Sequence, residues 1–369
     1  LAPREALVPP AELFSSKRMQ QDIAFLADAS LAGRGLGTPQ LARAADYIAQ
    51  QFKAAGLQPG GDNGSYYQAW QQQVDTLDAS VALKNVVAVL PGSDPRLVGQ
   101  SLVIGAHYDH MGLGEVNGRH EDRGIIHPGA DDNASGIAVM LELARSLKGK
   151  PLPRTLVFVA FTGEETGLLG SRHYVQQSAP YPADGIIAML NLDTVGRLGE
   201  RPLTLFGTGT ADEWVHIFRG AGYVTGVPVT AVADDFGSGD QTAFIEAGIP
   251  AVQFFSGSHE DFHRPGDTPE KLDYDGLARV AEVLNETVRY LGGRPQPLNS
   301  TLDGPRSHAA PARSSSRRVS FGTVPDFAYS GNGVRLDDVR AGTPAERAGL
   351  RKGDIIIAVN GTAVTDMRS

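Results

Sequence analysis

Apolar residues along the chain fall into short continuous runs that alternate with stretches of helical spacing. The runs are rich in Val, Ile, Leu and Phe, and they cover residues 85–90, 101–107, 155–161, 186–192 and 251–255. Apolar positions recur at helical spacing over residues 38–55, 134–147 and 277–291. Strands that are apolar on both faces and alternate with helices are typical of a largely parallel sheet covered by helices on both sides. The pattern therefore predicts an α/β domain with three layers.

The composition changes after Gly293. Residues 294–318 are rich in Pro, Ser, Ala and Arg and show no periodicity, which is typical of a flexible linker. Strand-like runs return at residues 334–339 and 354–359. We therefore predict a main domain over residues 1–293, a linker over 294–318 and a small β-rich domain over 319–369. The small domain is short for an independent fold, and we expect it to be truncated.

The charge balance of the chain excludes some classes of partner. Lys and Arg number 33 and Asp and Glu number 42, which gives a formal net charge of −9. A protein that binds nucleic acid needs a basic surface, so nucleic acid is not expected as a partner. No apolar run approaches the roughly 20 residues of a membrane helix, so no membrane span is expected. An acidic balance is compatible with carboxylates that hold divalent cations.

The chain contains no cysteine. Disulfides, thiol nucleophiles and metal sites built from Cys are therefore excluded, and any metal must bind to His, Asp and Glu. The chain begins at Leu1 without Met or a signal sequence. We interpret it as a processed or trimmed chain.

Acidic and imidazole side chains follow most of the predicted strands. In an open α/β sheet, ligands bind outside the carboxyl ends of the strands, so we expect these side chains to converge. Imidazole and carboxylate are ligands of catalytic zinc, and one bridging carboxylate allows two metals to share the set. A further carboxylate is then needed to take a proton from water. The residues concerned are His107, Asp109, Asp131, Asp132, Glu164, Glu165, Asp193 and His263.

Each of these clusters also has a purely structural interpretation. A single His107-x-Asp109 after a strand is often structural, and Asp131-Asp132 before a helix can serve as a cap favoured by the helix dipole. His263 alone is a weak signal. Glu164-Glu165 after a buried strand is harder to explain structurally, because charges there cost free energy unless they are paired. The combination at one sheet edge favours a metal site.

Together these residues resemble the co-catalytic zinc aminopeptidases, a family that includes bacterial leucyl aminopeptidases and, more distantly, glutamate carboxypeptidase and the transferrin receptor. The resemblance extends from about residue 32 to residue 291. It begins with Leu-Ala-Gly-Arg-Gly-Leu-Gly-Thr at 31–38 and continues to Asp267-Thr268. It implies the zinc-exopeptidase fold and cleavage of N-terminal residues from peptides by a water held between two zinc ions. Mn²⁺ or Co²⁺ can substitute in such sites.

The resemblance also implies a role for each ligand. His107, Asp131 and Asp193 would hold one zinc ion. His263, Glu165 and Asp131 would hold the other, so that Asp131 is the bridge. The resemblance further implies that the peptide bond between Asp131 and Asp132 is cis.

The remaining catalytic roles also follow from the resemblance. Glu164 would be the general base that activates the water and then the acid that protonates the leaving amine. Asp109 would lie behind His107 and fix its orientation.

The chain departs from the family pattern at two places beside the site. Close relatives often have Tyr before the last His, whereas this chain has Phe262, which cannot donate a hydrogen bond to an oxyanion. Relatives often have Ser-Asp-His where this chain has Gly239-Asp240-Gln241. We expect Phe262, Asp240 and Gln241 to bind substrate together with His127.

The loop between Asp109 and Asp131 contains further histidines, His110, His120 and His127. They are compatible with a third metal site. We prefer the interpretation of a solvated loop.

The C-terminal residues are similar to a PDZ domain of the kind attached to bacterial proteases. The similarity lies in Pro-Ala-Glu-Arg-Ala-Gly-Leu at 344–350 and Gly-Asp-Ile-Ile at 353–356. Such domains bind extended peptides by adding a strand to a sheet edge. The usual second helix and closing strands are not found before Ser369. A small domain that only packs or tethers is therefore the alternative to a peptide ligand.

Peptides with a free N-terminus are the expected substrates. Alternatives on the same site are a carboxypeptidase, dipeptidase or deacylase, but only a short segment separates Asp193 from His263, which leaves no room for the lid domain of that group. Glutaminyl cyclisation uses one zinc, and the presence of His107 argues against it. A non-catalytic receptor would have lost ligands. Relatives of this type are often exported, so a secreted or periplasmic location in a bacterium is expected.

Overall fold

The computed structural model describes residues 13–74, 77–114, 118, 120–177, 181–237, 239–302, 321–326, 329, 331–339 and 342–365. Most of the predicted linker therefore lies outside the described residues. Among the described residues, no helix combines the length and the apolar character of a membrane span.

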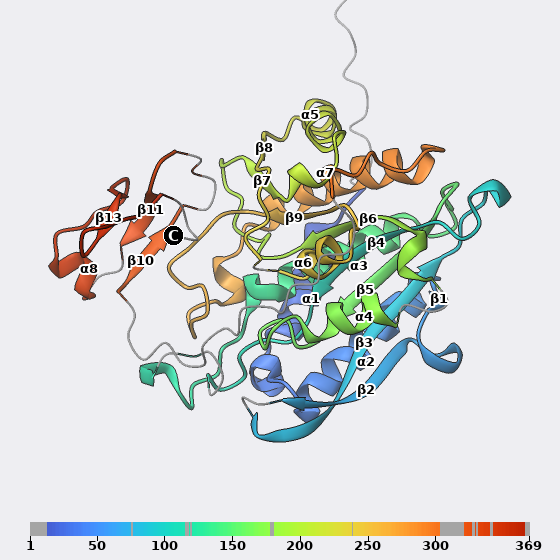
Figure 1. Ribbon diagram of the computed structural model, residues 1–369. Coiled ribbons are helices and arrows are strands. Elements are labelled where there is room, and N and C mark those ends of the chain that lie inside the picture. The colour runs from blue at the N-terminus through green and yellow to red at the C-terminus, as the bar shows by residue number, and fades with distance from the viewer. Residues whose placement is uncertain are drawn as a thin grey trace, which may run out of the picture.

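A nine-stranded mixed sheet forms the centre of the molecule (Figure 1). Its strand order is β1-β3-β5-β4-β6-β9-β7-β8, and β2 pairs with β3. The inner strands β5, β4, β6 and β9 run parallel, whereas β3 pairs with β5 and β7 pairs with β9 in antiparallel fashion. The strands are β1 (Gln58–Pro59), β2 (Tyr67–Val74), β3 (Ala79–Leu90), β4 (Ser101–His107), β5 (Thr155–Phe161), β6 (Ile186–Leu192), β7 (Leu203–Phe206), β8 (Val229–Ala231) and β9 (Ala251–Phe255).

Helices cover both faces of the sheet, so the predicted three-layer architecture is confirmed (Figure 1). The helices of one face are α1 (Ser16–Leu26), α2 (Pro39–Ala54), α3 (Gly136–Ser146), α5 (Trp214–Thr225) and α7 (Tyr274–Gly293). The helices of the other face are α4 (Leu169–Gln176) and α6 (Gln241–Glu246). Successive residues of each inner strand point to opposite faces of the sheet and pack into the apolar core on that face. In β5, Leu156 and Phe158 face the first set of helices, and Val157 and Val159 face the second.

Local sequence signals explain why helix α2 begins where it does and why β4 packs closely on its neighbour. Helix α2 begins after Thr38, whose hydroxyl accepts the N–H of Leu41, and Pro39 occupies its first turn. The apolar positions of α2 are buried against the sheet, which confirms the predicted helix. In β4, a Cβ at Gly105 would lie 2.5 Å from the ring of Phe161. Only glycine allows this close approach of β4 to its neighbour.

The C-terminal residues form a small, separate β-rich unit (Figure 1). It consists of β10 (Thr323–Pro325), β11 (Val334–Val339), α8 (Pro344–Arg347), β12 (Ile355–Ile356), β13 (Ala358–Val359) and β14 (Thr362–Ala363). The single strand predicted at 354–359 is wrong, because β12 pairs with β11 whereas β13 pairs with β14. In the described part of the C-terminal unit, the buried apolar residues are Val324, Leu336 and Ala345.

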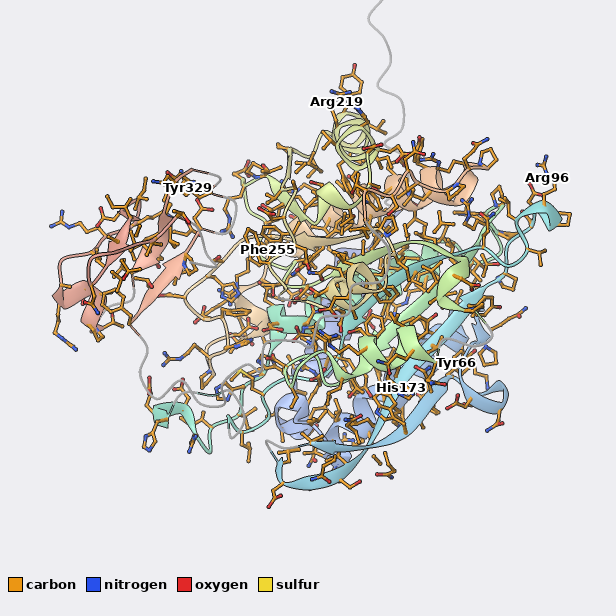
Figure 2. The ribbon with its side chains drawn as sticks, in the orientation of Figure 1. Tyr66, Arg96, His173, Arg219, Phe255 and Tyr329 are labelled. Atoms are coloured by element: carbon orange, nitrogen blue, oxygen red, sulfur yellow. The ribbon has the colours of Figure 1, made fainter. Side chains whose placement is uncertain are left out.

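The C-terminal unit contacts the main domain at the loop that follows β9. The hydroxyl of Ser258 donates to the carbonyl oxygen of Pro325 at 3.0 Å, and Arg201 lies 3.8 Å from Asp337. Figure 2 shows Tyr329 of this unit and Arg96 of the main domain at opposite sides of the molecule. The unit therefore lies beside the loop after β9, which carries His263.

Candidate metal centre

The predicted ligands lie together at one edge of the sheet. Because the inner strands are parallel, their carboxyl ends meet there and bring the loops that follow them into contact. Contributing positions are His107 as the last residue of β4, Glu164 and Glu165 after β5, Asp193 after β6, His263 after β9, and the helical turn Ala130–Ser135 before α3.

One group of possible metal ligands is formed by His107, Asp132 and Asp193. His107 Nε2 lies 3.2 Å from Asp132 Oδ1 and 3.4 Å from Asp193 Oδ1. All three side chains are buried. Since His107 Nδ1 lies 3.1 Å from the carbonyl oxygen of Asp109, it is expected to carry the proton and leave Nε2 free for a metal.

A second group surrounds the other oxygen of the same aspartate. His263 Nε2 lies 3.0 Å from Asp132 Oδ2 and 3.2 Å from Glu165 Oε2. The second oxygen of Glu165 lies 2.7 Å from His110 Nδ1. His110, Asp132 and Glu165 also form a cluster that could hold a metal. Asp132 therefore faces both groups, one oxygen to each, which is the position of a bridging ligand.

The prediction that Asp131 lies between the two groups is wrong. Asp131 Oδ1 accepts the N–H of Gly196 at 2.6 Å, and its Oδ2 lies 3.2 Å from His259 Nε2. The cis peptide bond joins Asp132 to Asn133 instead of Asp131 to Asp132. Adjacent residues direct their side chains differently, so the choice between two neighbouring aspartates depends on contacts that sequence order does not reveal.

Glu164 and Glu165 lie next to each other, but their surroundings shift their pKa values in opposite directions. Burial raises the pKa of Glu164 well above the usual range, and the neighbouring Glu165 adds to the shift. Burial also acts on Glu165, but the charges of His263 and His110 outweigh it and lower the pKa of Glu165. Two adjacent carboxyl groups with pKa values driven apart are typical of a proton-transfer residue beside an anionic ligand. Glu164 belongs to neither group of possible ligands.

Asp109 lies behind His107, but its backbone makes the orienting contact. The carboxylate Oδ1 lies 3.8 Å from His107 Nδ1, farther than the carbonyl oxygen of the same residue. Asp109 Oδ1 instead accepts the backbone N–H of Glu164 at 3.2 Å. Asp109 therefore connects the end of β4 to the loop that carries Glu164 and Glu165.

Arg34 is a residue of the site that sequence reasoning missed. Its side chain is fully buried, and its guanidinium donates to the carbonyl oxygens of Tyr108 at 2.8 Å, Pro128 at 2.8 Å and Gly129 at 2.9 Å. It thus joins the loop after β4 to the turn that carries Asp132. Burial lowers the pKa of Arg34 to about 10, so the group stays charged at neutral pH. Its position in the stretch at 31–38 was the available signal.

Three of the residues expected to bind substrate lie away from the surface. Asp240, Gln241 and His127 are fully buried. Gln241 donates at 2.9 Å to the side-chain oxygen of Gln253, and Gln253 donates at 3.1 Å to Asp193 Oδ2. Gln241 therefore orients a possible ligand through Gln253.

The opening of the site lies at His263. Phe262 is 39% exposed and its ring stacks on His263 with centroids 4.0 Å apart.

The interpretation of a solvated loop between Asp109 and Asp131 is wrong for His110 and His127, which are buried. His120 is exposed, as expected.

The donor set suits a hard to borderline cation. Carboxylate oxygens of Asp132 and Asp193 converge on one imidazole nitrogen, and burial raises the pKa of Asp193. His110 Nε2 is buried without a hydrogen-bond partner. Imidazole and carboxylate donors without thiolates fit Zn²⁺, with Mn²⁺ and Co²⁺ as substitutes.

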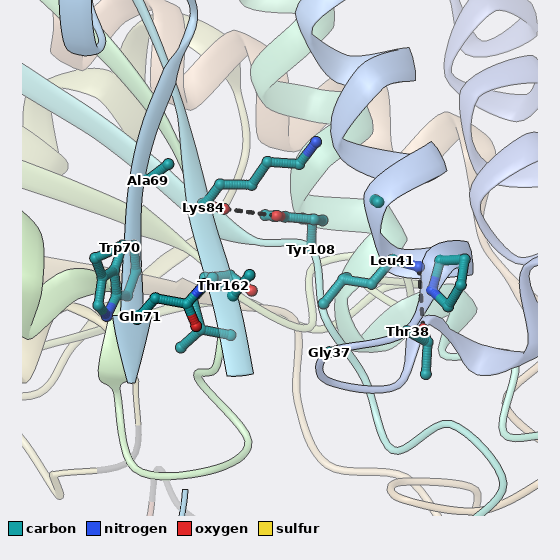
Figure 3. A pocket seen from close by; sticks show the side chains of 13 residues that line it. Gly37, Thr38, Leu41, Ala69, Trp70, Gln71, Lys84, Tyr108 and Thr162 are labelled. Carbon is teal, nitrogen blue, oxygen red and sulfur yellow. Dashed lines mark hydrogen bonds between the residues drawn. The ribbon is translucent and has the colours of Figure 1, made fainter. Parts of the chain in front are cut away.

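A separate cavity of about 600 Å³ lies between the start of α2 and the β2–β3 hairpin (Figure 3). It is lined by Leu41, Trp70 and Lys84, and by Tyr108 and Thr162 on the side of the site. None of the possible metal ligands lines it. The cavity is therefore adjacent to the metal centre and distinct from it.

Comparison with known proteins agrees with the geometry. The sequence profile of peptidase family M28 matches residues 85–288, more than half of the chain, and that of the PDZ domain matches residues 335–368. The chain is 33% identical to aminopeptidase YwaD of Bacillus subtilis (strain 168) in an alignment of 178 residues that covers 46% of this chain and 39% of that protein. The chain spans 39% to 62% of the length of the first curated relatives it matches.

Two solved structures illustrate the likeness in fold. A zinc aminopeptidase from Bacillus subtilis is 19% identical, with a TM-score of 0.60 over 78% of this chain and 96% of that chain. The glutaminyl cyclase of Porphyromonas gingivalis is 18% identical, with a TM-score of 0.63 over 76% of this chain and 99% of that chain. At these identities the likeness concerns the fold alone.

Proposed function

Because the chain belongs to peptidase family M28, we propose that it is a zinc-dependent aminopeptidase that removes N-terminal residues from peptides. The observation that carries this proposal is the position of Asp132. One of its oxygens faces His107 and Asp193, and the other faces His263 and Glu165. This arrangement supports two zinc ions that share one carboxylate.

Two neighbouring groups complete the proposed set. His107, Asp132 and Asp193 would hold one zinc ion. Asp132, Glu165 and His263 would hold the other, with His110 against the far oxygen of Glu165. Zinc bound there would polarise the scissile carbonyl group and lower the pKa of an attacking water.

Glu164 would transfer the proton. It is nearly buried, it belongs to neither ligand group, and its pKa is raised by burial. A carboxylate with a raised pKa takes a proton from water more readily and then releases it to the leaving amine. The backbone N–H of Glu164 is fixed on Asp109 Oδ1, which holds the loop in place.

The charge of the site favours an aminopeptidase over a carboxypeptidase. A carboxypeptidase needs a cationic group to bind the α-carboxylate of its substrate. In the described part of the site, two arginines are already engaged: buried Arg34 donates to carbonyl oxygens, and half-buried Arg197 donates to Asp261 and Asp267. The excess of carboxylates attracts a free α-ammonium group instead.

Hydrolysis of aminoacyl-p-nitroanilides tests this proposal. Each substrate is supplied with a free and with an acetylated α-amine, before chelation, after chelation and after return of zinc. Cleavage only of free-amine substrates, abolished by the chelator and restored by zinc, is the expected result. Bound zinc without any cleavage, or equal cleavage of acetylated substrates, would contradict it. A peptide with N-terminal Gln, analysed by mass spectrometry for loss of ammonia, tests cyclisation in the same experiment.

A further inference from the structure

A buried carboxylate outside the ligand groups binds the backbone that carries Asp132. Asp267 is fully buried in the loop after β9, and its carboxylate accepts the N–H of Asp131 at 3.0 Å and that of Asp132 at 3.0 Å. The backbone adds a further bond, from the N–H of Ala130 to the carbonyl oxygen of Asp267 at 3.2 Å. The turn before α3 is therefore fixed to the loop that carries His263.

Arg197 neutralises this carboxylate and connects a third loop to it. Its Nη2 donates to Asp267 Oδ1 at 3.1 Å, and its Nη1 donates to Asp261 Oδ2 at 2.8 Å. Its Nε lies 3.8 Å from Asp131 Oδ2. Arg197 follows Asp193 in the loop after β6, so it joins that loop to both of the others. These carboxylates raise the pKa of Arg197 despite its burial.

The direction of the Asp132 side chain depends on these contacts. The two N–H groups that Asp267 accepts belong to the peptide units on both sides of Asp131, so they fix the backbone that leads into Asp132. The Asp132 carboxylate then lies within 3.2 Å of His107 and 3.0 Å of His263. A displacement of about 1 Å in such a site can lower activity about 10²-fold.

From this geometry we propose that Asp267 and Arg197 are a pair of positioning residues that hold Asp132 between the two histidines. The inference rests on the proposed function, because it concerns the bridging ligand of the same centre. A carboxylate is needed at 267 because it accepts several N–H groups at once. A cation is needed at 197 because a buried carboxylate without one is strongly destabilising.

Substitutions at both positions test the pair. Asp267→Asn keeps the shape of the side chain but points an N–H₂ group at backbone donors. Arg197→Met removes the cation, and Arg197→Lys restores the charge. Lys271→Met is the matched control, because Lys271 binds Asp261 from the exposed side, at 2.6 Å, and is not bonded to Asp267. For each variant we would measure the zinc affinity by chelator competition, the visible spectrum of the Co²⁺ form and the melting temperature of the metal-free protein.

The expected result is a zinc affinity lowered by about 10- to 100-fold in Asp267→Asn and Arg197→Met. The Co²⁺ spectrum should change in both, Arg197→Lys should recover part of the affinity, and Lys271→Met should match the wild type. Wild-type zinc affinity and an unaltered Co²⁺ spectrum in Asp267→Asn, with only a lower melting temperature, would overturn the proposal. If Asp267→Asn does not fold, the zinc affinities of Arg197→Lys and Arg197→Met test the proposal. Equal affinities in these two variants and the wild type would overturn it.

Failure of the proposed function has a different signature. If the wild-type protein binds no zinc or cleaves no peptide, the proposed function fails, whatever the variants do. If the wild-type protein binds zinc and the Asp267 and Arg197 variants bind it equally well, only the positioning role fails.

Discussion

The two halves of the metal centre differ in how they are held. His107 is the last residue of an inner strand and is buried, with hydrogen-bonded neighbours on both sides of β4. His263 lies in a loop, has a positive φ of 57°, and its side chain is 32% exposed. The half around His107 is therefore built by the sheet, whereas the half around His263 is built by contacts between loops. Substrate is expected to enter beside His263, where the site opens.

The largest effect is expected for a residue that belongs to neither half. Glu164→Gln should lower kcat by about 10²- to 10⁴-fold, because the amide cannot take the proton from water. Zinc content, measured by mass spectrometry of the native protein, should equal that of the wild type. Loss of zinc in this variant would place Glu164 among the ligands. It would contradict the assignment of metal binding and proton transfer to different residues.

Removal of one histidine from each half tests the comparison directly. In the metal-free protein, His107→Ala removes the buried imidazole that Asp132 and Asp193 share, and it should lower the free energy of unfolding by about 3–5 kcal/mol. His263→Ala concerns a more exposed side chain and should lower it by about 1 kcal/mol. Urea unfolding measures both. Equal losses would show that the two halves are held alike.

The smallest expected effect concerns the opening beside His263. Phe262→Tyr adds a hydroxyl that can donate to the developing oxyanion, and one hydrogen bond of about 1 kcal/mol should raise kcat about fivefold. KM should change little, because the bond strengthens in the transition state. Phe262→Leu is the control for loss of the ring. An unchanged kcat in Phe262→Tyr would mean that the oxyanion lies away from the stacked ring.

The difference between the half built by the sheet and the half built by loop contacts also explains which features could be predicted from the sequence. The inner strands and the helices α2, α3 and α7 follow from apolar periodicity, which is local, and their order brings His107, Glu165 and Asp193 to one edge. The choice of Asp132 over Asp131 could not be predicted, because it depends on hydrogen bonds to Asp267, far along the chain. The sequence contains both aspartates but not the direction of their side chains.

Other errors have the same physical origin. Gln241 was expected to bind substrate, but its amide lies in a buried network that reaches Asp193 through Gln253. Arg34 belongs to a conspicuous stretch, yet its bonds run to carbonyl oxygens of Tyr108 and Gly129, which no side-chain pattern reports. Backbone acceptors leave no signal in the sequence, so residues that act through them are found only in the structure.

The link from Asp267 to the turn before α3 has a consequence for the synthesis of the chain. The ribosome makes His107, Asp132 and Asp193 well before His263 and Asp267, since the chain grows from its N-terminus. A nascent chain that ends before residue 263 lacks both the second histidine and the carboxylate that fixes Asp132. The growing polypeptide therefore cannot assemble the complete centre, and the proposed activity would arise only when the main domain is almost finished.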